Sequence, residues 1–318
     1  MKIALGIDIG GTKTAYGFVD EKGNVLLEKS VFTTSLSTPL DLVQLIKSEA
    51  VNFGYFDELV GVGIGAPNGN QFTGSIDFAP NLHWKGQIPL VQLFKNEFTC
   101  IVLLTNDANA AAIGEKLFGV AKDFTDFVEI TLGTGLGSGI FVQNELLLGK
   151  HGIAGEYGHI RMIPNGRVCG CGRKGCLETY ASSTGVVRSI SELQSDNKKI
   201  SKLIWLENPT AKDVFDLALN NDLFAIEIVD FTAKILGSAL ADYTAFSDPE
   251  AFVLFGGLSK NGDFFTKKVE EEMNKNMLNI YQNKVKVLTS SLNDLNAAIL
   301  GTSATIFWEF FKEKKIIQ

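Results

Sequence analysis

The sequence predicts an α/β protein built from two lobes. Its 318 residues are more than one ordinary core requires and enough for two well-buried ones. The chain opens with three apolar runs, a helical segment and a further apolar run, in the order strand, strand, strand, helix, strand. A strand, glycine turn and strand then recur near residue 130. Together these observations predict two packed α/β units.

Composition and charge exclude several classes of protein. Hydrophobic residues make up 45% of the chain and charged residues 20%, which is ordinary for a globular protein. The 29 Lys and Arg residues against 36 Asp and Glu give a net charge of −7, so no nucleic-acid partner is expected. The short N-terminal apolar run is broken by Asp8, which favours a strand over a signal peptide, and no apolar run is long enough to cross a bilayer. We expect a cytoplasmic protein with no membrane partner.

The first lobe is expected to begin with three strands. Apolar runs at residues 2–11, 12–20 and 23–34 are joined by glycine-containing turns and should form an antiparallel meander. Residues 38–53 start with Thr-Pro and carry apolar residues at helical spacing, which predicts a helix. The apolar run 59–67 then predicts a buried strand.

The next strand ends where polar residues begin. Residues 100–104 form an apolar run that breaks at Asn106 and Asp107 into an alanine-rich helix ending near Gly119. Residues 126–149 then give a strand, a glycine-rich turn and a strand. Polar side chains are therefore expected at the junction between a strand and a helix.

The second half of the chain is mainly helical. Residues 208–250 predict two helices broken near Asn220, and residues 251–260 predict a strand that runs into a double glycine. Residues 293–315 are rich in alanine and aromatic residues and predict a pair of helices.

Two glycine turns suggest an internal repeat. Aligning the run that starts at Ile7 with the run that starts at Ile130 places Gly10 against Gly133, each between two apolar strands. Two homologous halves would explain the match, and so would two unrelated glycine hairpins.

Three strands end in glycine-rich turns that suit phosphate, at residues 8–14, 132–139 and 255–262. Glycines let clustered N–H groups approach an anion, although each turn alone is more typical of a plain connection, and none matches the P-loop or the dinucleotide pattern. Asp8 is the residue type that holds a hydrated Mg²⁺ against phosphates, or that caps a turn. The candidate nucleotide ligands are Asp8, Gly10, Gly11, Thr12, Lys13, Thr14, Gly133, Thr134, Gly135, Gly137, Gly256 and Gly257.

Three of the four cysteines lie within eight residues, which predicts a structural zinc site. Cys169, Cys171 and Cys176, with His159 upstream, supply four ligands for a closed tetrahedral Zn²⁺. A redox pair would favour Cys-x-x-Cys on a helix, and the glycines here disfavour a helix. Neighbouring basic residues could offset the negative charge of the site: Arg167, Arg173 and Lys174. Cys100 stands alone on an apolar strand and is expected in the core.

Six motifs in this order resemble the ROK family of sugar kinases and related repressors: "IDIGGTKTAYGFVD", "TNDANAAAIGE", "ITLGTGLGSGIF", "GEYGHI", "CGCGRKGCLETYAS" and "FGGLS". The resemblance covers essentially the whole chain. It implies the actin-like ATPase fold of sugar kinases and hexokinases, with two lobes around a central cleft. The smaller lobe would comprise residues 1–107, completed by a C-terminal helix at 298–318, and the larger lobe residues 108–297, with a zinc-bound loop at 159–178.

By the same resemblance the protein is an ATP-dependent hexokinase that uses ATP with Mg²⁺ and acts on a hexose 6-hydroxyl. Glucose is the first candidate substrate, and N-acetylhexosamines, mannose and fructose are alternatives. Polyphosphate is an alternative donor. A sugar-responsive repressor is a further alternative, although we expect a helix-turn-helix module ahead of such a protein. Family members tend to form homodimers or higher homo-oligomers.

The resemblance also assigns the site residues. Asp107 matches the catalytic base; its alternative role is to cap the following helix, whose N-terminus would lower the pKa of the carboxyl. His159 would bind both zinc and sugar, so the zinc would fix the sugar contacts. The sugar ligands expected from matching positions are Asn106, Asp107, Glu156, His159 and Glu178. Asn68 and Asn81 are further candidates, although their Asn-Gly and Pro-Asn contexts are equally typical of turns.

Overall fold

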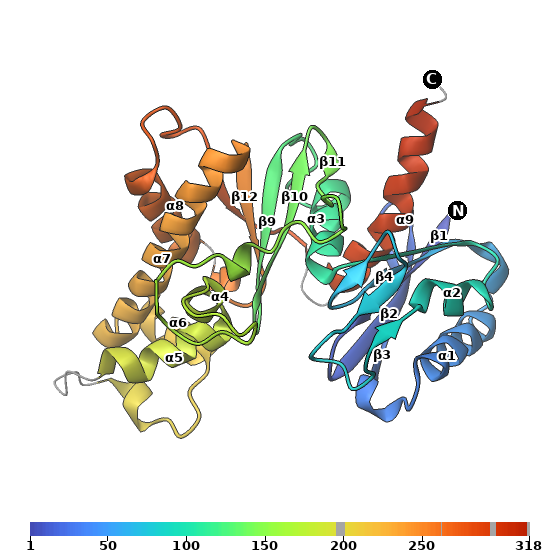
Figure 1. Ribbon diagram of the computed structural model, residues 1–318, viewed down its shortest axis with the longest axis horizontal. Coiled ribbons are helices and arrows are strands. Elements are labelled where there is room, and N and C mark those ends of the chain that lie inside the picture. The colour runs from blue at the N-terminus through green and yellow to red at the C-terminus, as the bar shows by residue number, and fades with distance from the viewer. Residues whose placement is uncertain (195–200, 262, 293–296, 317–318) are drawn as a thin grey trace. The chain divides into compact units, whose positions relative to one another are not determined.

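A computed structural model describes residues 1–194, 201–261, 263–292 and 297–316 (Figure 1). The chain divides into two compact units. The first unit comprises Met1–Asp123, Leu146–Ala154 and Ser291–Gln318, and the second comprises Phe124–Glu145 and Gly155–Ser290. The division expected at residue 107 falls one helix earlier than this one, because the helix after Asp107 packs with the first unit.

The first unit is built on a five-stranded sheet in the order β3-β2-β1-β4-β8. Its strands are β1 (Ile3–Ile9), β2 (Lys13–Asp20), β3 (Val25–Phe32), β4 (Leu59–Gly65) and β8 (Ile101–Thr105). The first three form the antiparallel meander expected from the sequence, and β1, β4 and β8 run parallel. The register pairs Asp8 with Gly65 and Gly65 with Thr105. The residues that follow these strands therefore gather at one edge of the sheet.

Helices cover this sheet, and a three-stranded sheet lies beside it. The helices are α1 (Pro39–Asn52), α2 (Leu90–Lys95), α3 (Asp107–Phe118) and α9 (Ala297–Ile316), and the small sheet contains β5 (Gly69–Asn70), β6 (Ser75–Asp77) and β7 (Gln87–Ile88). The helix α1 starts with a capping box between Thr38 and Asp41, as its Thr-Pro start suggests. The helix pair expected at 293–315 is instead one helix from residue 297, because no break interrupts α9; residues 293–296 lie outside the described part.

The C-terminal helix α9 packs directly on β1, β4 and α3. Alternate glycines of β4 make this contact possible. A Cβ atom at Gly63 would collide with the Thr302 carbonyl of α9, and one at Gly61 would lie 2.6 Å from the Ile306 side chain. At the crossing with α3, a Cβ at Gly301 would lie 2.7 Å from the Ala110 carbonyl. These glycines let the C-terminal helix close the core of the first unit.

The second unit repeats the sheet of the first, in the order β11-β10-β9-β12-β13. Its strands are β9 (Phe127–Leu132), β10 (Leu136–Val142), β11 (Glu145–Leu146), β12 (Ala251–Phe255) and β13 (Lys286–Thr289). As in the first sheet, the leading hairpin is antiparallel and the next two strands run parallel to β9. The same positions, after β1 and after β9, carry the two glycine turns. This shared topology supports an internal repeat over two unrelated hairpins.

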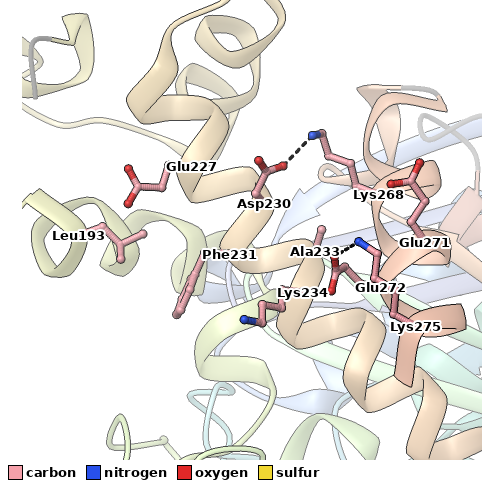
Figure 2. A pocket seen from close by; sticks show the side chains of 10 residues that line it. All are labelled: Leu193, Glu227, Asp230, Phe231, Ala233, Lys234, Lys268, Glu271, Glu272 and Lys275. Carbon is pink, nitrogen blue, oxygen red and sulfur yellow. Dashed lines mark hydrogen bonds and ion pairs between the residues drawn. The ribbon is translucent and has the colours of Figure 1, made fainter. Parts of the chain in front are cut away.

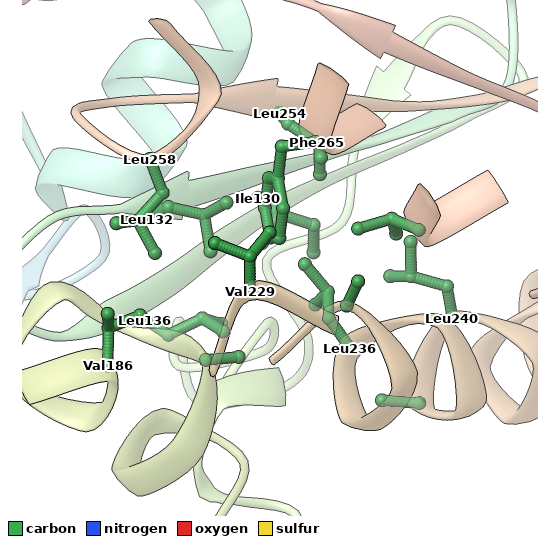
Figure 3. Packing of buried hydrophobic residues seen from close by; sticks show 14 of the residues in the cluster. Ile130, Leu132, Leu136, Val186, Val229, Leu236, Leu240, Leu254, Leu258 and Phe265 are labelled. Carbon is green, nitrogen blue, oxygen red and sulfur yellow. The ribbon is translucent and has the colours of Figure 1, made fainter. Parts of the chain in front are cut away.

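Helices and short turns complete the second unit: η3 (Tyr157–His159), α4 (Glu178–Ala181), α5 (Ser183–Leu193), η5 (Lys202–Trp205), α6 (Ala211–Leu219), α7 (Leu223–Ser247), η6 (Ser259–Asn261) and α8 (Asp263–Asn276). Side chains from β9, β10, β12 and these helices form its core, among them Ile130, Val229 and Phe265 (Figure 3). The break expected near Asn220 lies between α6 and α7. Among the described residues, none of the helices has the length and apolar character needed to cross a membrane.

Candidate active site and metal centre

Two carboxylates converge at the edge of the first sheet. Asp8 lies near the end of β1, and Asp107 follows β8 as the first residue of α3. Gly65 of β4 stands between these strands, and a Cβ added there would lie 3.5 Å from Asp8 Oδ1. Burial, and after it the negative charge of Asp107, raise the pKa of Asp8 to about 7. A bound cation would favour the ionised form of these carboxylates, because it would offset the repulsion between their charges.

Asn106, not Asp107, caps the helix α3. Its Oδ1 accepts hydrogen bonds from the N–H groups of Ala108 at 2.7 Å and Asn109 at 3.3 Å. Asp107 Oδ1 also accepts from the Ala108 N–H, at 2.9 Å, but from within the first turn. Capping of α3 therefore does not account for Asp107, because its neighbour already fills that role.

The pKa of Asp107 is raised, opposite to the direction expected from its place at a helix start. The Ala108 N–H does act to lower it, as the sequence argument requires. The side chain still meets solvent, yet protein atoms surround the carboxyl and their desolvation effect is the larger one. The expected sign was wrong because desolvation of this helix start depends on the folded packing around it. A carboxylate with a raised pKa is a stronger proton acceptor.

The first glycine turn is shaped by hydrogen bonds to its own sheet. The Gly10 N–H donates to the Lys13 carbonyl at 2.9 Å, and the Thr33 hydroxyl donates to the Gly10 carbonyl at 2.7 Å. Thr14 is fully buried and its hydroxyl bonds that of Thr33 at 2.9 Å, so the expectation that Thr14 faces a phosphate is not supported. Gly10, Gly11, Thr12 and Lys13 remain accessible to solvent.

The two asparagines of the neighbouring loops lie in different settings. A Cβ at Gly11 would collide with the Asn81 carbonyl, so the loop that carries Asn81 lies against the first glycine turn. Asn68 has a left-handed φ of 53°, and its side-chain N–H donates to the Asp77 carbonyl at 2.9 Å. Of the two alternatives for Asn68, the structure shows it acting as a turn residue.

The cysteine cluster predicted from the sequence is assembled in the second unit. One ligand atom from each of His159, Cys169, Cys171 and Cys176 lies within 4.8 Å of all the others. Cys171 Sγ lies 3.7 Å from Cys176 Sγ, and Cys169 Sγ lies 3.6 Å from His159 Nδ1. A tetrahedral site with Zn–S bonds of about 2.3 Å has S···S edges of about 3.8 Å. The donor set and its spacing therefore fit zinc.

His159 turns one ring nitrogen to the cluster and the other to a carboxylate. Nδ1 faces Cys169, while Nε2 lies 3.8 Å from Glu156 Oε2. The short turn η3 that carries His159 is fixed to α7. The Tyr243 hydroxyl donates to the Tyr157 carbonyl at 2.7 Å, and the rings of these two tyrosines are in tilted contact at 3.9 Å between centroids. Two expected sugar ligands are thus brought together beside the metal cluster.

The basic residues near the cluster divide into two roles. Arg173 supports Cys171. Desolvation raises the pKa of that thiol, but hydrogen bonds from Arg173, together with those of Cys169 and Cys176, outweigh it and bring the value to about 6. Arg167 is instead buried, with its Nε donating to Glu192 of α5 at 2.9 Å and its guanidinium 4.4 Å from the Tyr180 ring centroid. Arg167 therefore anchors the loop rather than offsetting the charge of the metal site.

The remaining glycine turns meet at the ends of β9 and β12. A Cβ at Gly256, whose φ is 105°, would lie 2.7 Å from the Leu132 carbonyl, just before Gly133. The Gly137 N–H donates to the Thr131 hydroxyl at 3.1 Å. Gly133 and Gly257 have open space where a Cβ would stand. The glycines of the second unit are thus a contiguous group at one sheet edge, as those of the first unit are.

Glu178, expected as a sugar ligand, lies between the glycine turn and the cluster. Its Oε2 accepts the Leu136 N–H at 3.1 Å, and its Oε1 lies 3.5 Å from Cys169 Sγ. Sequence reasoning missed this contact and the anchors Arg167 and Tyr243. Each of these three interactions joins residues at least nine positions apart in the chain, so no local sequence pattern could predict it.

A hollow of about 440 Å³ also lies between α5, α7 and α8 (Figure 2). Its lining carries acids and lysines, with ion pairs of 2.6 Å between Lys268 and Asp230 and 2.7 Å between Lys275 and Glu272. It contains none of the residues expected at the active site. With one ion pair between α7 and α8 and another within α8, it is a solvated surface groove.

The whole chain can be compared with known proteins. Residues 4–307 match the ROK family. The chain belongs to the ROK family. A glucokinase from Streptomyces coelicolor is 40% identical over 270 residues, covering 83% of this chain and 84% of that protein. A glucokinase from Thermotoga maritima is 33% identical over 308 residues, covering 95% and 96%.

A solved ROK structure agrees with this assignment. The ROK family glucokinase from Streptomyces griseus, crystallised with glucose and AMPPNP, superposes with a TM-score of 0.80 at 32% identity and covers 95% of this chain and 98% of that one. The sugar kinase fold expected from the motifs is therefore confirmed.

Proposed function

We propose that this ROK protein is an ATP-dependent hexokinase that transfers the γ-phosphoryl group of ATP to the 6-hydroxyl of glucose. Family membership and glucokinase relatives at 33–40% identity support the activity. The observation in the structure that carries the proposal is the pair Asp8 and Asp107 at one sheet edge, with an accessible glycine turn beside Asp8.

Asp107 is the proposed base. As the 6-hydroxyl oxygen forms its bond to the γ-phosphorus, the bond from that phosphorus to the β,γ-bridging oxygen breaks and ADP leaves. The hydroxyl proton passes to the Asp107 carboxylate. Desolvation by the surrounding protein atoms raises the pKa of Asp107 and so favours this transfer. Because the transition state is loose, the base acts late and alignment of the reactants supplies much of the acceleration.

Asp8 is the proposed residue for Mg²⁺, held through its water shell. Its half-buried carboxylate beside a second acid suits a divalent cation. When bound, the cation neutralises phosphate charge. Backbone N–H groups would hold the phosphates: those of Gly11, Thr12 and Lys13 in the first unit, and those of Thr134, Gly135, Gly256 and Gly257 in the second. Gly10, Gly133 and Gly137 would shape the turns, because their own N–H groups are bonded within the protein.

The proposed sugar ligands are Asn106, Glu156, His159 and Glu178, with Asn68 and Asn81 as secondary candidates. Zinc on His159 Nδ1 and the three cysteines would fix the imidazole and leave its Nε2 for a hydroxyl. Four protein ligands leave zinc no open position, so its proposed role is to hold the sugar ligands in place. We further propose a homodimer or higher homo-oligomer, to be tested by light scattering coupled to size exclusion.

A coupled assay of ADP release tests the activity and its substrate together. Glucose is compared with mannose, fructose, N-acetylglucosamine and N-acetylmannosamine, with ATP or polyphosphate as donor. Glucose with ATP should give the highest kcat/KM. A higher value for an N-acetylhexosamine would reassign the substrate, whereas no ADP release with any sugar would contradict the kinase proposal and favour a sugar-binding repressor.

Asp107→Asn tests the base directly. Loss of the proton acceptor should lower kcat by about 10²- to 10⁴-fold. The matched control is Asp57→Asn, which removes an exposed carboxylate of the same unit outside the site. A kcat of the Asp107 variant within threefold of the control would rule Asp107 out as the base.

A further inference from the structure

The glycine turn between β9 and β10 is hydrogen-bonded to the segment that follows the cysteine loop. The Ser183 N–H donates to the Gly133 carbonyl at 2.9 Å, and the Thr184 hydroxyl donates to the Thr134 carbonyl at 2.8 Å. Two successive carbonyls of the turn are therefore held against the start of α5.

Holding these carbonyls fixes the direction of the adjoining N–H groups. Peptide units are planar, and no cis bond occurs across the described residues, so each C=O points opposite to the N–H of the next residue. The N–H groups of Thr134 and Gly135 therefore point away from α5. Clustered backbone N–H groups of this kind bind anions. The hydrogen bonds from α5 thus prepare the turn for phosphate.

The Glu178 carboxylate joins the same turn to the cysteine cluster. Its Oε2 accepts the Leu136 N–H, and its Oε1 lies 3.5 Å from Cys169 Sγ. A Cβ at Gly135 would collide with Oε2, so the backbone of the turn rests directly on this carboxylate. A displacement of Cys169 would therefore be passed to the turn, because no space separates the two.

The histidine end of the loop reaches the turn as well. A Cβ at Gly158, next to His159, would collide with the Leu136 carbonyl. The two ends of the cysteine loop thus contact the two backbone polar groups of Leu136: Glu178 accepts its N–H, and Gly158, next to His159, lies against its carbonyl. The metal cluster and the turn are therefore in direct contact.

We propose that Thr184 and Glu178 are positioning residues that aim the Thr134 and Gly135 N–H groups at the nucleotide phosphates, so that the metal cluster sets nucleotide affinity. This inference rests on the proposed function, which gives the cluster a role toward sugar alone. Both roles are compatible at Glu178, because a carboxylate has about four acceptor positions.

The test measures AMPPNP binding with Mg²⁺ by calorimetry in the absence of sugar. Thr184→Val keeps the side-chain shape and removes the hydroxyl donor, whereas Thr184→Ser keeps the donor and is the matched control. Thr184 is exposed, so both variants should fold. Valine should weaken AMPPNP binding by about fivefold, serine should stay within twofold of the wild type, and glucose binding should be unchanged in both. Equal AMPPNP affinity of the valine variant and the wild type would overturn the proposal, as would an equal loss of glucose affinity.

A second arm tests the metal. Zinc is removed from the wild type with phenanthroline, the chelator is removed by desalting, and circular dichroism checks that the fold persists. The zinc-free protein should bind AMPPNP more weakly and recover on adding zinc. Unchanged affinity would overturn the link from the cluster to the turn. A zinc-loaded wild type that does not bind AMPPNP would instead contradict the proposed function.

Discussion

Replacing Asp8 by asparagine should stabilise the magnesium-free protein at pH 8 and leave it nearly unchanged at pH 4. Asp8 is half-buried, and burial together with the charge of Asp107 raises its pKa to about 7. At pH 8 the folded protein must therefore hold an ionised carboxylate in a poor environment. Asparagine has a similar shape and no charge, so it removes that cost.

The size and sign of the effect follow from the two pKa values. The rise from 3.8 to about 7 corresponds to at most about 4 kcal/mol, at about 1.4 kcal/mol for each pH unit. Between pH 4 and pH 7 the folded protein retains a proton that the unfolded chain has released. The free energy of unfolding of the wild type therefore falls as pH rises through this window, and Asp8→Asn lacks this contribution. Because solvent reaches part of the carboxyl, we expect a difference of about 1 to 3 kcal/mol.

The assay is urea unfolding at pH 4 to 8, without magnesium, nucleotide or chelator, so that any zinc is retained. The difference between variant and wild type should grow with pH and level off above 7. Asp107→Asn should reduce the same pH dependence, because it removes the charge that opposes ionisation of Asp8, while Asp57→Asn controls for the loss of a carboxyl. A difference that is flat from pH 4 to 8 would refute the reasoning.

Two further predictions concern the metal loop and the core. Cys171→Ser should lose bound zinc, measured by mass spectrometry, and should raise the KM for sugar. The control Cys100→Ser should keep the metal. Metal loss with unchanged sugar kinetics would contradict the role of zinc in holding the sugar ligands. Gly63→Ala should lower the free energy of unfolding by about 1 to 3 kcal/mol, because its Cβ meets the Thr302 carbonyl; an unchanged melting temperature would show that α9 does not pack this closely on β4.

The fold could be predicted where local patterns decide it. Alternating apolar runs and glycine turns located the meander, and the polar break at Asn106 located the start of α3. The direct packing of α9 on β4 could not be predicted, because the glycines at 61, 63 and 65 acquire their meaning only when a distant helix covers them. The C-terminal segment was mistaken for two helices because its composition changes along its length while its backbone does not break.

The candidate site divides in the same way. Cysteine spacing identified the metal cluster, because all three cysteines lie in one short loop and only His159 is further away. The pKa of Asp107 was expected in the wrong direction, because a helix start is visible in the sequence and the desolvation of its carboxyl by distant residues is not. Arg167 was expected to offset the charge of the metal site because it is near in the chain, but its guanidinium binds Glu192 of α5.

The most direct test of the central claim is a ³¹P NMR time course of ATP, Mg²⁺ and glucose with the wild-type protein and with Asp107→Asn. The wild type should convert the γ-phosphate signal of ATP into one sugar 6-phosphate signal with equal formation of ADP, and the variant should do so at least 100-fold more slowly. Release of inorganic phosphate alone, or the same rate in both proteins, would contradict a glucose kinase that uses Asp107 as its base.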